Sequence, residues 1–128
     1  MTEPVDPRTE SLATAVIGCA IEVHRVLGPG FPEAVYEESM AIELAKQGLP
    51  FERQRSFEVR YCGRVVGAGR LDLLVGGSLV VELKAVEAIS PIHKAQVLSY
   101  LRATGLRLGL ILNFNCAVLK SGIARVIV

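Results

Sequence analysis

The sequence predicts an α/β (α+β) fold whose elements follow the order α-α-β-β-β-α-β-β. Three observations favour this class. Apolar residues recur at helical spacing near the N-terminus, two runs of β-forming residues flank a glycine turn in mid-chain, and a nearly continuous apolar run follows a third helical segment. With 128 residues, of which 51% are hydrophobic and 5% aromatic, the chain is long enough for one mainly aliphatic core.

Two helices are expected before the first strand. The first covers residues 9–27, and a Gly-Pro-Gly segment ends it. The second begins at Pro32, which suits a first helical turn, and runs to about Gln47. Its apolar face is expected to consist of Val35, Met40, Ile42, Leu44 and Ala45.

Three strands are expected in the middle of the chain. Residues 51–61 alternate apolar and charged side chains in part, which predicts a half-exposed strand. A Cys-Gly turn leads into a second strand at residues 64–75, and a glycine turn leads from there into a third at residues 79–83. These two turns make the middle of the chain an antiparallel meander.

The last third of the chain predicts a helix and two strands. Ser90 and Pro91 are typical of a helix start, and this helix is expected to end near Thr104. The apolar run at residues 106–113 is typical of a strand buried on both faces, and a short strand at residues 124–128 closes the fold.

The hairpin in mid-chain carries two carboxylates and a lysine, and its register decides whether they meet. A two-residue glycine loop would pair Asp72 with Val81 and turn Asp72 and Glu82 to opposite faces. A three-residue Gly-Gly-Ser loop would pair Asp72 with Glu82 and place both carboxylates beside Lys84. Such charges in an apolar hairpin are costly to desolvate unless they hold a cation or one another. The alternatives are therefore a cation site and a structural ion cluster.

Composition narrows the cofactors, partners and location. The formal net charge is +1, which excludes a global polycation, although residues 65–128 are net positive and residues 1–64 net negative. The three cysteines lack the spacing of a zinc site, so free thiols and a reducing, cytoplasmic location are expected. Neither a signal peptide nor a membrane-spanning segment is expected. Residues 1–8 are predicted to form a flexible tail before a single domain at residues 9–128.

Several other side chains are candidates for a site. Gln96 and Tyr100 lie four residues apart and therefore share a helix face, which is also common in an ordinary amphipathic helix. Lys94 in the same helix is by default a surface residue, Tyr36 a packing residue, and Glu33 an acid placed favourably at a helix N-terminus.

Taken together, the motifs resemble the GxxExxY family, a branch of the PD-(D/E)xK nuclease-like (restriction-endonuclease-like) superfamily. The signature is G-F-P-E-A-V-Y, with Gly30, Glu33 and Tyr36 at the named positions. The segments R-L-D-L-L-V, V-E-L-K, H-K-A-Q-V-L-S-Y-L and L-G-L-I-L-N-F follow in the family's order, so the resemblance runs from about residue 10 to the C-terminus. It implies an αβββαβ core with a central mixed sheet flanked by helices, preceded by an extra N-terminal helix.

The resemblance also implies roles for individual residues. Asp72, Glu82 and Lys84 match the D…ExK set, and Glu33 matches an acid on the first core helix. Asp72, Glu82 and the Leu83 carbonyl would bind Mg²⁺ or Mn²⁺, and Lys84 would act on the attacking water. The residues implied to position nucleic acid are Gln96, Tyr100, Tyr36 and Lys94.

The function these features favour is a metal-dependent nuclease that acts on nucleic acid, with DNA as the favoured substrate. It would work alone, as a homo-oligomer, or with a protein partner in a larger DNA-processing assembly. One alternative is a non-catalytic module that keeps the nuclease fold and binds nucleic acid or protein. A third is a homo-oligomeric structural protein whose ion cluster is merely buried.

Overall fold

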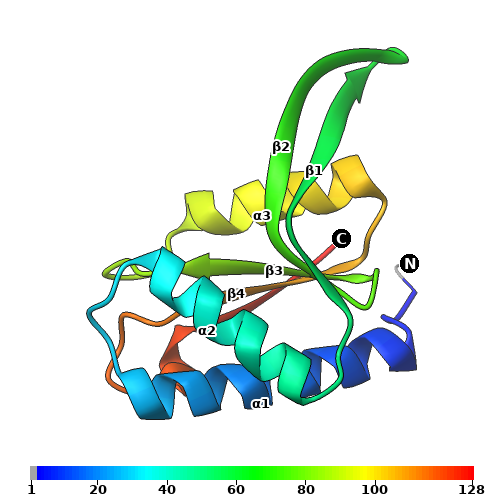
Figure 1. The fold of residues 1–128 in the computed structure, drawn as a ribbon. Coiled ribbons are helices and arrows are strands. Elements are labelled where there is room, and N and C mark those ends of the chain that lie inside the picture. Colours follow the sequence, from blue (N-terminus) through cyan, green and yellow to red (C-terminus); the bar gives the residue numbers. More distant parts are fainter. Residues whose placement is uncertain (1–2) are drawn as a thin grey trace.

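A mixed sheet forms the centre of the computed structural model, which describes residues 3–128 (Figure 1). Its strands are β1 (Phe51–Tyr61), β2 (Arg64–Val75), β3 (Leu79–Lys84), β4 (Leu108–Asn113) and β5 (Ile123–Ile127). They lie side by side in chain order, with β3 and β4 parallel and the other neighbours antiparallel. The parallel pair needs a crossover connection, which the third helix supplies. The predicted α/β class is confirmed.

Helices cover both faces of this sheet (Figure 1). The helices α1 (Pro7–Leu27) and α2 (Glu33–Lys46) pack on one face, against a large aliphatic cluster from β2, β3 and β4. Helix α3 (Pro91–Thr104) packs on the other face through Val97 and Leu101, and its N-terminal turn has the predicted cap at Ser90. The extra N-terminal helix is therefore an integral part of one core layer.

The first helix begins earlier than predicted. The Asp6 side chain accepts a hydrogen bond of 2.9 Å from the main-chain N–H of Thr9, and Pro7 fills the first helical position. This cap-and-proline start is a standard N-terminal signal, and it moves the helix start back from residue 9 to residue 7. Residues 1 and 2 of the predicted tail lie outside the described residues.

The predicted apolar face of α2 was partly wrong. The side chains that it buries are Tyr36, Met40 and Leu44, whereas Ile42 is 62% exposed. The buried three follow a strict four-residue spacing, so they form one stripe along the helix. The Tyr36 ring stacks on Phe114 with centroids 4.4 Å apart, and its hydroxyl donates a 2.6 Å hydrogen bond to the Gly28 carbonyl. Tyr36 thereby fixes the turn between α1 and α2.

The turn between β2 and β3 settles the hairpin register. Val75 pairs with Leu79, so the loop has three residues, and both of its glycines have positive φ (59° at Gly76 and 72° at Gly77). A Cβ atom on Gly76 would lie 2.6 Å from the Leu12 side chain of α1, so this corner is tightly packed. The three-residue alternative is confirmed.

The far halves of β1 and β2 project from the body as a two-stranded ribbon (Figure 1). We call residues 58–68 the arm. Every residue of the arm is exposed, so the prediction of a half-exposed strand was wrong for this part of β1. The arm lacks burial because β3 ends at Lys84 and pairs with β2 only from Leu73 onward.

The C-terminal strands differ slightly from expectation. Strand β4 begins at Leu108 rather than residue 106, and β5 ends at Ile127 rather than residue 128. A short 3-10 helix, η1 (Leu119–Gly122), was not predicted.

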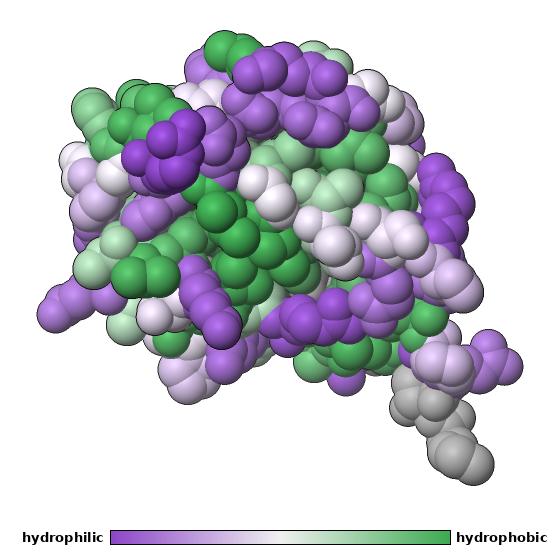
Figure 2. All heavy atoms as spheres, turned by 90° about the horizontal axis from the view of Figure 1, so that it is seen from below, coloured by the Kyte–Doolittle hydropathy of each residue, from purple (hydrophilic) through white to green (hydrophobic). Residues whose placement is uncertain are grey.

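Exposed apolar side chains also lie on α1, α2 and the loop before η1, and Figure 2 shows apolar surface among polar side chains on the face seen from below.

Candidate active site

Asp72 and Glu82 face each other across the β2–β3 hairpin, and their carboxylates bond to the opposite main chain. The regular β2–β3 pairing ends at Leu73 and Val81, and one more step along the strands brings Asp72 opposite Glu82. There, the Asp72 N–H donates to Glu82 Oε2 at 2.7 Å, and the Leu83 N–H donates to Asp72 Oδ2 at 2.9 Å. The carboxylates thus take the place of the sheet's main-chain acceptors.

Burial and mutual repulsion make this pair reluctant to carry two negative charges. Glu82 is only 5% exposed, and burial followed by the charge of Asp72 raises its pKa to about 8. Burial, and then the charge of Glu37, also raise the pKa of Asp72, while the Leu83 N–H opposes the shift. A proton or a cation at this position would therefore stabilise the folded chain.

Lys84 lies at the end of β3, half-buried, on the same side of the strand as Glu82. Its positive charge lowers the pKa of both Asp72 and Glu82. Within residues 3–128, however, no ion pair joins the Lys84 ammonium to a carboxylate. The direct ion pair that a structural Asp/Glu–Lys cluster would need is thus not among the recorded contacts.

A pocket of about 440 Å³ opens beside the two carboxylates, between the start of α2 and the strands. Its lining residues are Glu33, Ala34, Glu37, Gln54, Arg70, Asp72 and Leu83. Glu33 thereby joins Asp72 at one surface, as the resemblance implied, and its charge contributes to the raised pKa of Glu82. Glu82 itself lies behind this surface and is linked to it through its bond to the Asp72 main chain.

Three charged or polar residues that line this pocket were not predicted as site residues from the sequence. Glu37 lies one helical turn after Glu33, and Arg70 lies two residues before Asp72, so helix and strand periodicity could have found both. Gln54 has a positive φ of 49° and donates a 2.6 Å hydrogen bond to Glu37, which Arg53 also contacts at 2.8 Å. A positive φ at a glutamine leaves no sequence signal.

The residues implied to position nucleic acid lie in different places. The Tyr100 ring packs against Phe57 at 5.0 Å, and its pKa is raised by burial and then by the charges of Glu82 and Asp72, so it lies near the carboxylates. Gln96 and Lys94 are exposed on α3 and do not line the pocket. Tyr36 is fully buried in the α1–α2 turn, as described above.

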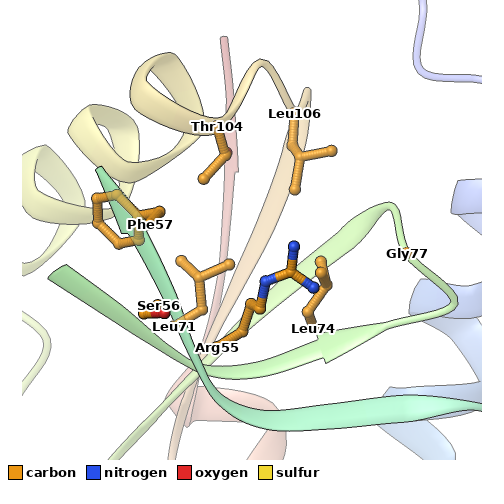
Figure 3. Close-up of a pocket in the computed structure, with 8 residues that line it drawn as sticks. All are labelled: Arg55, Ser56, Phe57, Leu71, Leu74, Gly77, Thr104 and Leu106. Carbon is orange, nitrogen blue, oxygen red and sulfur yellow. The ribbon is translucent and has the colours of Figure 1, made fainter. Parts of the chain in front are cut away.

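A second pocket, of about 320 Å³, lies between the base of the β1–β2 ribbon and the end of α3 (Figure 3). Leu71, Leu74 and Leu106 line it, together with Phe57 and Thr104. Arg55 reaches across it, but that guanidinium is bound to Glu52 at 2.8 Å. This pocket lacks a carboxylate in its lining, so the pocket beside Asp72 is the better candidate for an active site.

Comparison with known proteins identifies the family. A family model described as the PD-(D/E)XK nuclease superfamily matches residues 10–126. The chain belongs to the PD-(D/E)XK nuclease superfamily. This match spans α1 to β5 and agrees with the mixed sheet between helices. Neither the curated proteins nor the solved structures contain a significant match to the chain.

PD-(D/E)XK nucleases usually use divalent metals, and the residues here fit such an ion in a restricted way. No group of three or more His, Cys, Asp or Glu side chains within residues 3–128 is arranged to hold a metal. Mg²⁺, however, often uses one or two carboxylates and keeps several waters. Asp72 and Glu82 each commit one oxygen to a main-chain N–H, which leaves a second oxygen for a cation. The N–H and the carbonyl of one residue point to the same side of a strand, so the Leu83 carbonyl faces β2, as its N–H does.

Among the described residues, 3–128, no helix combines the length and apolar content that a bilayer crossing requires.

Proposed function

We propose that this protein is a divalent-metal-dependent nuclease that hydrolyses phosphodiester bonds in nucleic acid, with DNA as the favoured substrate. The observation that carries the proposal is the pairing of Asp72 and Glu82 at the pocket that Glu33 also lines. A pure scaffold has no need for a buried Glu82 whose pKa is raised by burial and by the charge of the neighbouring Asp72, because apolar residues of similar size would be at least as stable.

Each residue has a role in this proposal. Asp72, Glu82 and the Leu83 carbonyl hold Mg²⁺ or Mn²⁺, which supplies positive charge at the scissile phosphate when bound. Lys84 orients or deprotonates the attacking water and stabilises negative charge in the transition state. Glu33 supports the cation through water, and Tyr100, Gln96 and Lys94 position the nucleic acid.

We assign the chain within the superfamily to the GxxExxY family as part of the same proposal. Gly30, Glu33 and Tyr36 carry that signature, and two of them have separable tasks. Tyr36 anchors the turn through its hydroxyl, and Glu33 follows at the first position of α2, beside the pocket. A reducing, cytoplasmic location is also proposed, supported by the free thiols of Cys19, Cys62 and Cys116.

A cleavage panel tests the proposal. Supercoiled plasmid, single-stranded DNA and RNA are incubated with the protein in Mg²⁺, Mn²⁺ or EDTA, and products are followed on gels. We expect metal-dependent cleavage of DNA that Asp72→Asn abolishes, because the substitution removes a cation ligand but keeps the side-chain shape. A Glu3→Gln variant, altered in an exposed acid outside the helices, controls for preparation and net charge.

The second candidate is a non-catalytic module that binds nucleic acid or protein through the same fold. It is favoured by the arrangement of the carboxylates, since no three His, Cys, Asp or Glu side chains within residues 3–128 are placed to hold a metal together. Binding without cleavage in every arm of the panel, with unchanged affinity in Asp72→Asn, would support this candidate over the nuclease.

A further inference from the structure

The arm, residues 58–68, exposes several apolar side chains to solvent. Tyr61 is 72% exposed and Val66 is 63% exposed, so most of each side chain is accessible to solvent. The arm's strands pair only with each other, and the ribbon extends about 17 Å from its base if each of five residues rises about 3.4 Å. Apolar surface on a protruding ribbon is typical of an interaction site.

The charge of the arm and its base favours an anionic partner. Between Arg55 and Arg70 the chain carries four arginines and one acid, Glu58. The Arg60–Glu58 contact of 3.6 Å is exposed on both sides and contributes little. Arg64 and Arg70 have no recorded ion pair within residues 3–128. Arg55 is bound to Glu52, and the arm itself, with Arg60, Arg64 and Glu58, is net +1, so its charge favours an anion over a second copy of the chain as the occupant.

The arm is continuous with the candidate active site. Arg70 at its base lines the same pocket as Asp72, two residues further along β2. The eight steps along the strand from Arg64 to Asp72 span roughly 26 Å, which is less than one turn of B-form DNA, about 34 Å. A duplex whose backbone passes Asp72 is therefore within reach of the tip.

We propose that the arm lies in the major groove of duplex DNA and holds the scissile strand against the Asp72 pocket. Arg60 and Arg64 at the tip contact phosphates, and Arg70 contacts the backbone next to the reacting phosphate. A two-stranded ribbon fits the B-form major groove, whereas the major groove of an RNA duplex is too deep and narrow for it. The inference rests on the proposed nuclease function and narrows its substrate to duplex DNA.

Binding by a matched pair of charge reversals tests this surface. Fluorescence anisotropy is measured with a labelled DNA duplex of about 30 base pairs, the same single strand, and the RNA duplex. All proteins carry Asp72→Asn so that cleavage does not interfere. Arg64→Glu reverses one charge on the arm, and Lys120→Glu reverses one on η1; both residues are exposed and have no recorded ion pair within residues 3–128.

We expect Arg64→Glu to bind duplex DNA on the order of tenfold more weakly, with a smaller salt dependence, and Lys120→Glu to match the parent. Duplex DNA should bind more tightly than single-stranded DNA or duplex RNA. A second variant replaces residues 59–67 with Asn-Gly, which joins the paired residues Glu58 and Ala68 by a short turn. It removes the tip without touching the core, so it should keep its melting temperature and lose the duplex preference.

Three results would overturn the proposal in distinguishable ways. Equal binding by Arg64→Glu and Lys120→Glu would remove the arm from the interface, while metal-dependent cleavage by the wild type would leave the nuclease standing. Absence of nucleic-acid binding by the parent, together with absence of cleavage by the wild type, would overturn both. A dimer in sedimentation velocity that becomes a monomer when the arm is shortened would assign the arm to a second copy of the chain.

Discussion

At the scale of single residues, Glu82 dominates the behaviour of the site. Its carboxyl is nearly buried, accepts the Asp72 N–H, and has a pKa of about 8 in the folded chain compared with 4.5 in the unfolded chain. Because the folded state holds this proton more tightly, its stabilising effect is complete below pH 4.5 and is lost as pH rises toward 8. As pH rises toward 8, the folded chain therefore loses stability while Glu82 gains its negative charge.

This linkage predicts a pH-dependent effect of Glu82→Gln. In EDTA, we expect the melting temperature of the wild type to fall between pH 5 and pH 8 by on the order of 5 °C more than that of Glu82→Gln. The amide keeps an oxygen to accept the Asp72 N–H but does not ionise. Differential scanning calorimetry at several pH values measures the difference, and parallel melting curves for the two proteins would contradict it.

Lys84 separates catalysis from cation binding. Since Lys84 has no recorded ion pair within residues 3–128, Lys84→Met should fold and bind Mn²⁺ as the wild type does. We expect its cleavage rate to fall on the order of 10²–10³-fold, because the transition state loses the ammonium group proposed to stabilise its negative charge. Lys84→Ala should behave in the same way, which controls for the packing of the stem. Wild-type cleavage rates in both variants would make Lys84 structural.

At the scale of elements, the hairpin turn shows what sequence could and could not determine. The glycine turn located both strands, but Gly76 and Gly77 suit two-residue and three-residue loops equally well, so the register stayed open. In the structure the choice accompanies a long-range contact of Gly76 with Leu12 on α1. The apolar face of α2 was misjudged for a similar reason, because Tyr36 is buried by stacking on the distant Phe114.

The two turn glycines form a matched pair for mutation. Both have positive φ, but a Cβ on Gly76 would lie 2.6 Å from Leu12, whereas a Cβ on Gly77 would meet no atom within 4 Å. We expect Gly77→Ala to cost about 1 kcal/mol from backbone strain alone, and Gly76→Ala to cost more because Leu12 must also move. Urea denaturation of both variants measures the difference. Equal losses would mean that the corner repacks freely.

At the scale of the whole molecule, the proposed cation binding would be coupled to folding. Mg²⁺ or Mn²⁺ bound only by the native chain would stabilise it by mass action, by about 2.7 kcal/mol at a hundredfold excess over Kd. We expect a rise in melting temperature that grows with metal concentration at pH 8 and vanishes in Glu82→Gln. Thermal melts at a series of Mn²⁺ concentrations test this, with metal-free samples in EDTA as the reference. An equal rise in Glu82→Gln would place the ion elsewhere.

The sequence predicted the helices and strands of the fold, but it did not predict that the arm projects from the body. The order of the α-helices and strands, the turns that separate β1, β2 and β3, and the cap of α3 are local signals and were predicted, whereas η1 was not. The projection of the arm was not, because it depends on how far the neighbouring strand β3 extends. Glu37, Gln54 and Arg70 were missed because three separate elements deliver them to one pocket.

The exchange of main-chain acceptors for carboxylates between β2 and β3 gives the site its own spectroscopic probe. The amide protons of Asp72 and Leu83 point at Glu82 and Asp72, so their NMR chemical shifts follow the ionisation of those two groups directly. A cation bound to the second oxygen of each carboxylate would change the charge beside these amides and so shift the same two signals. Two backbone signals thus report on the chemistry of the pocket before any substrate is added.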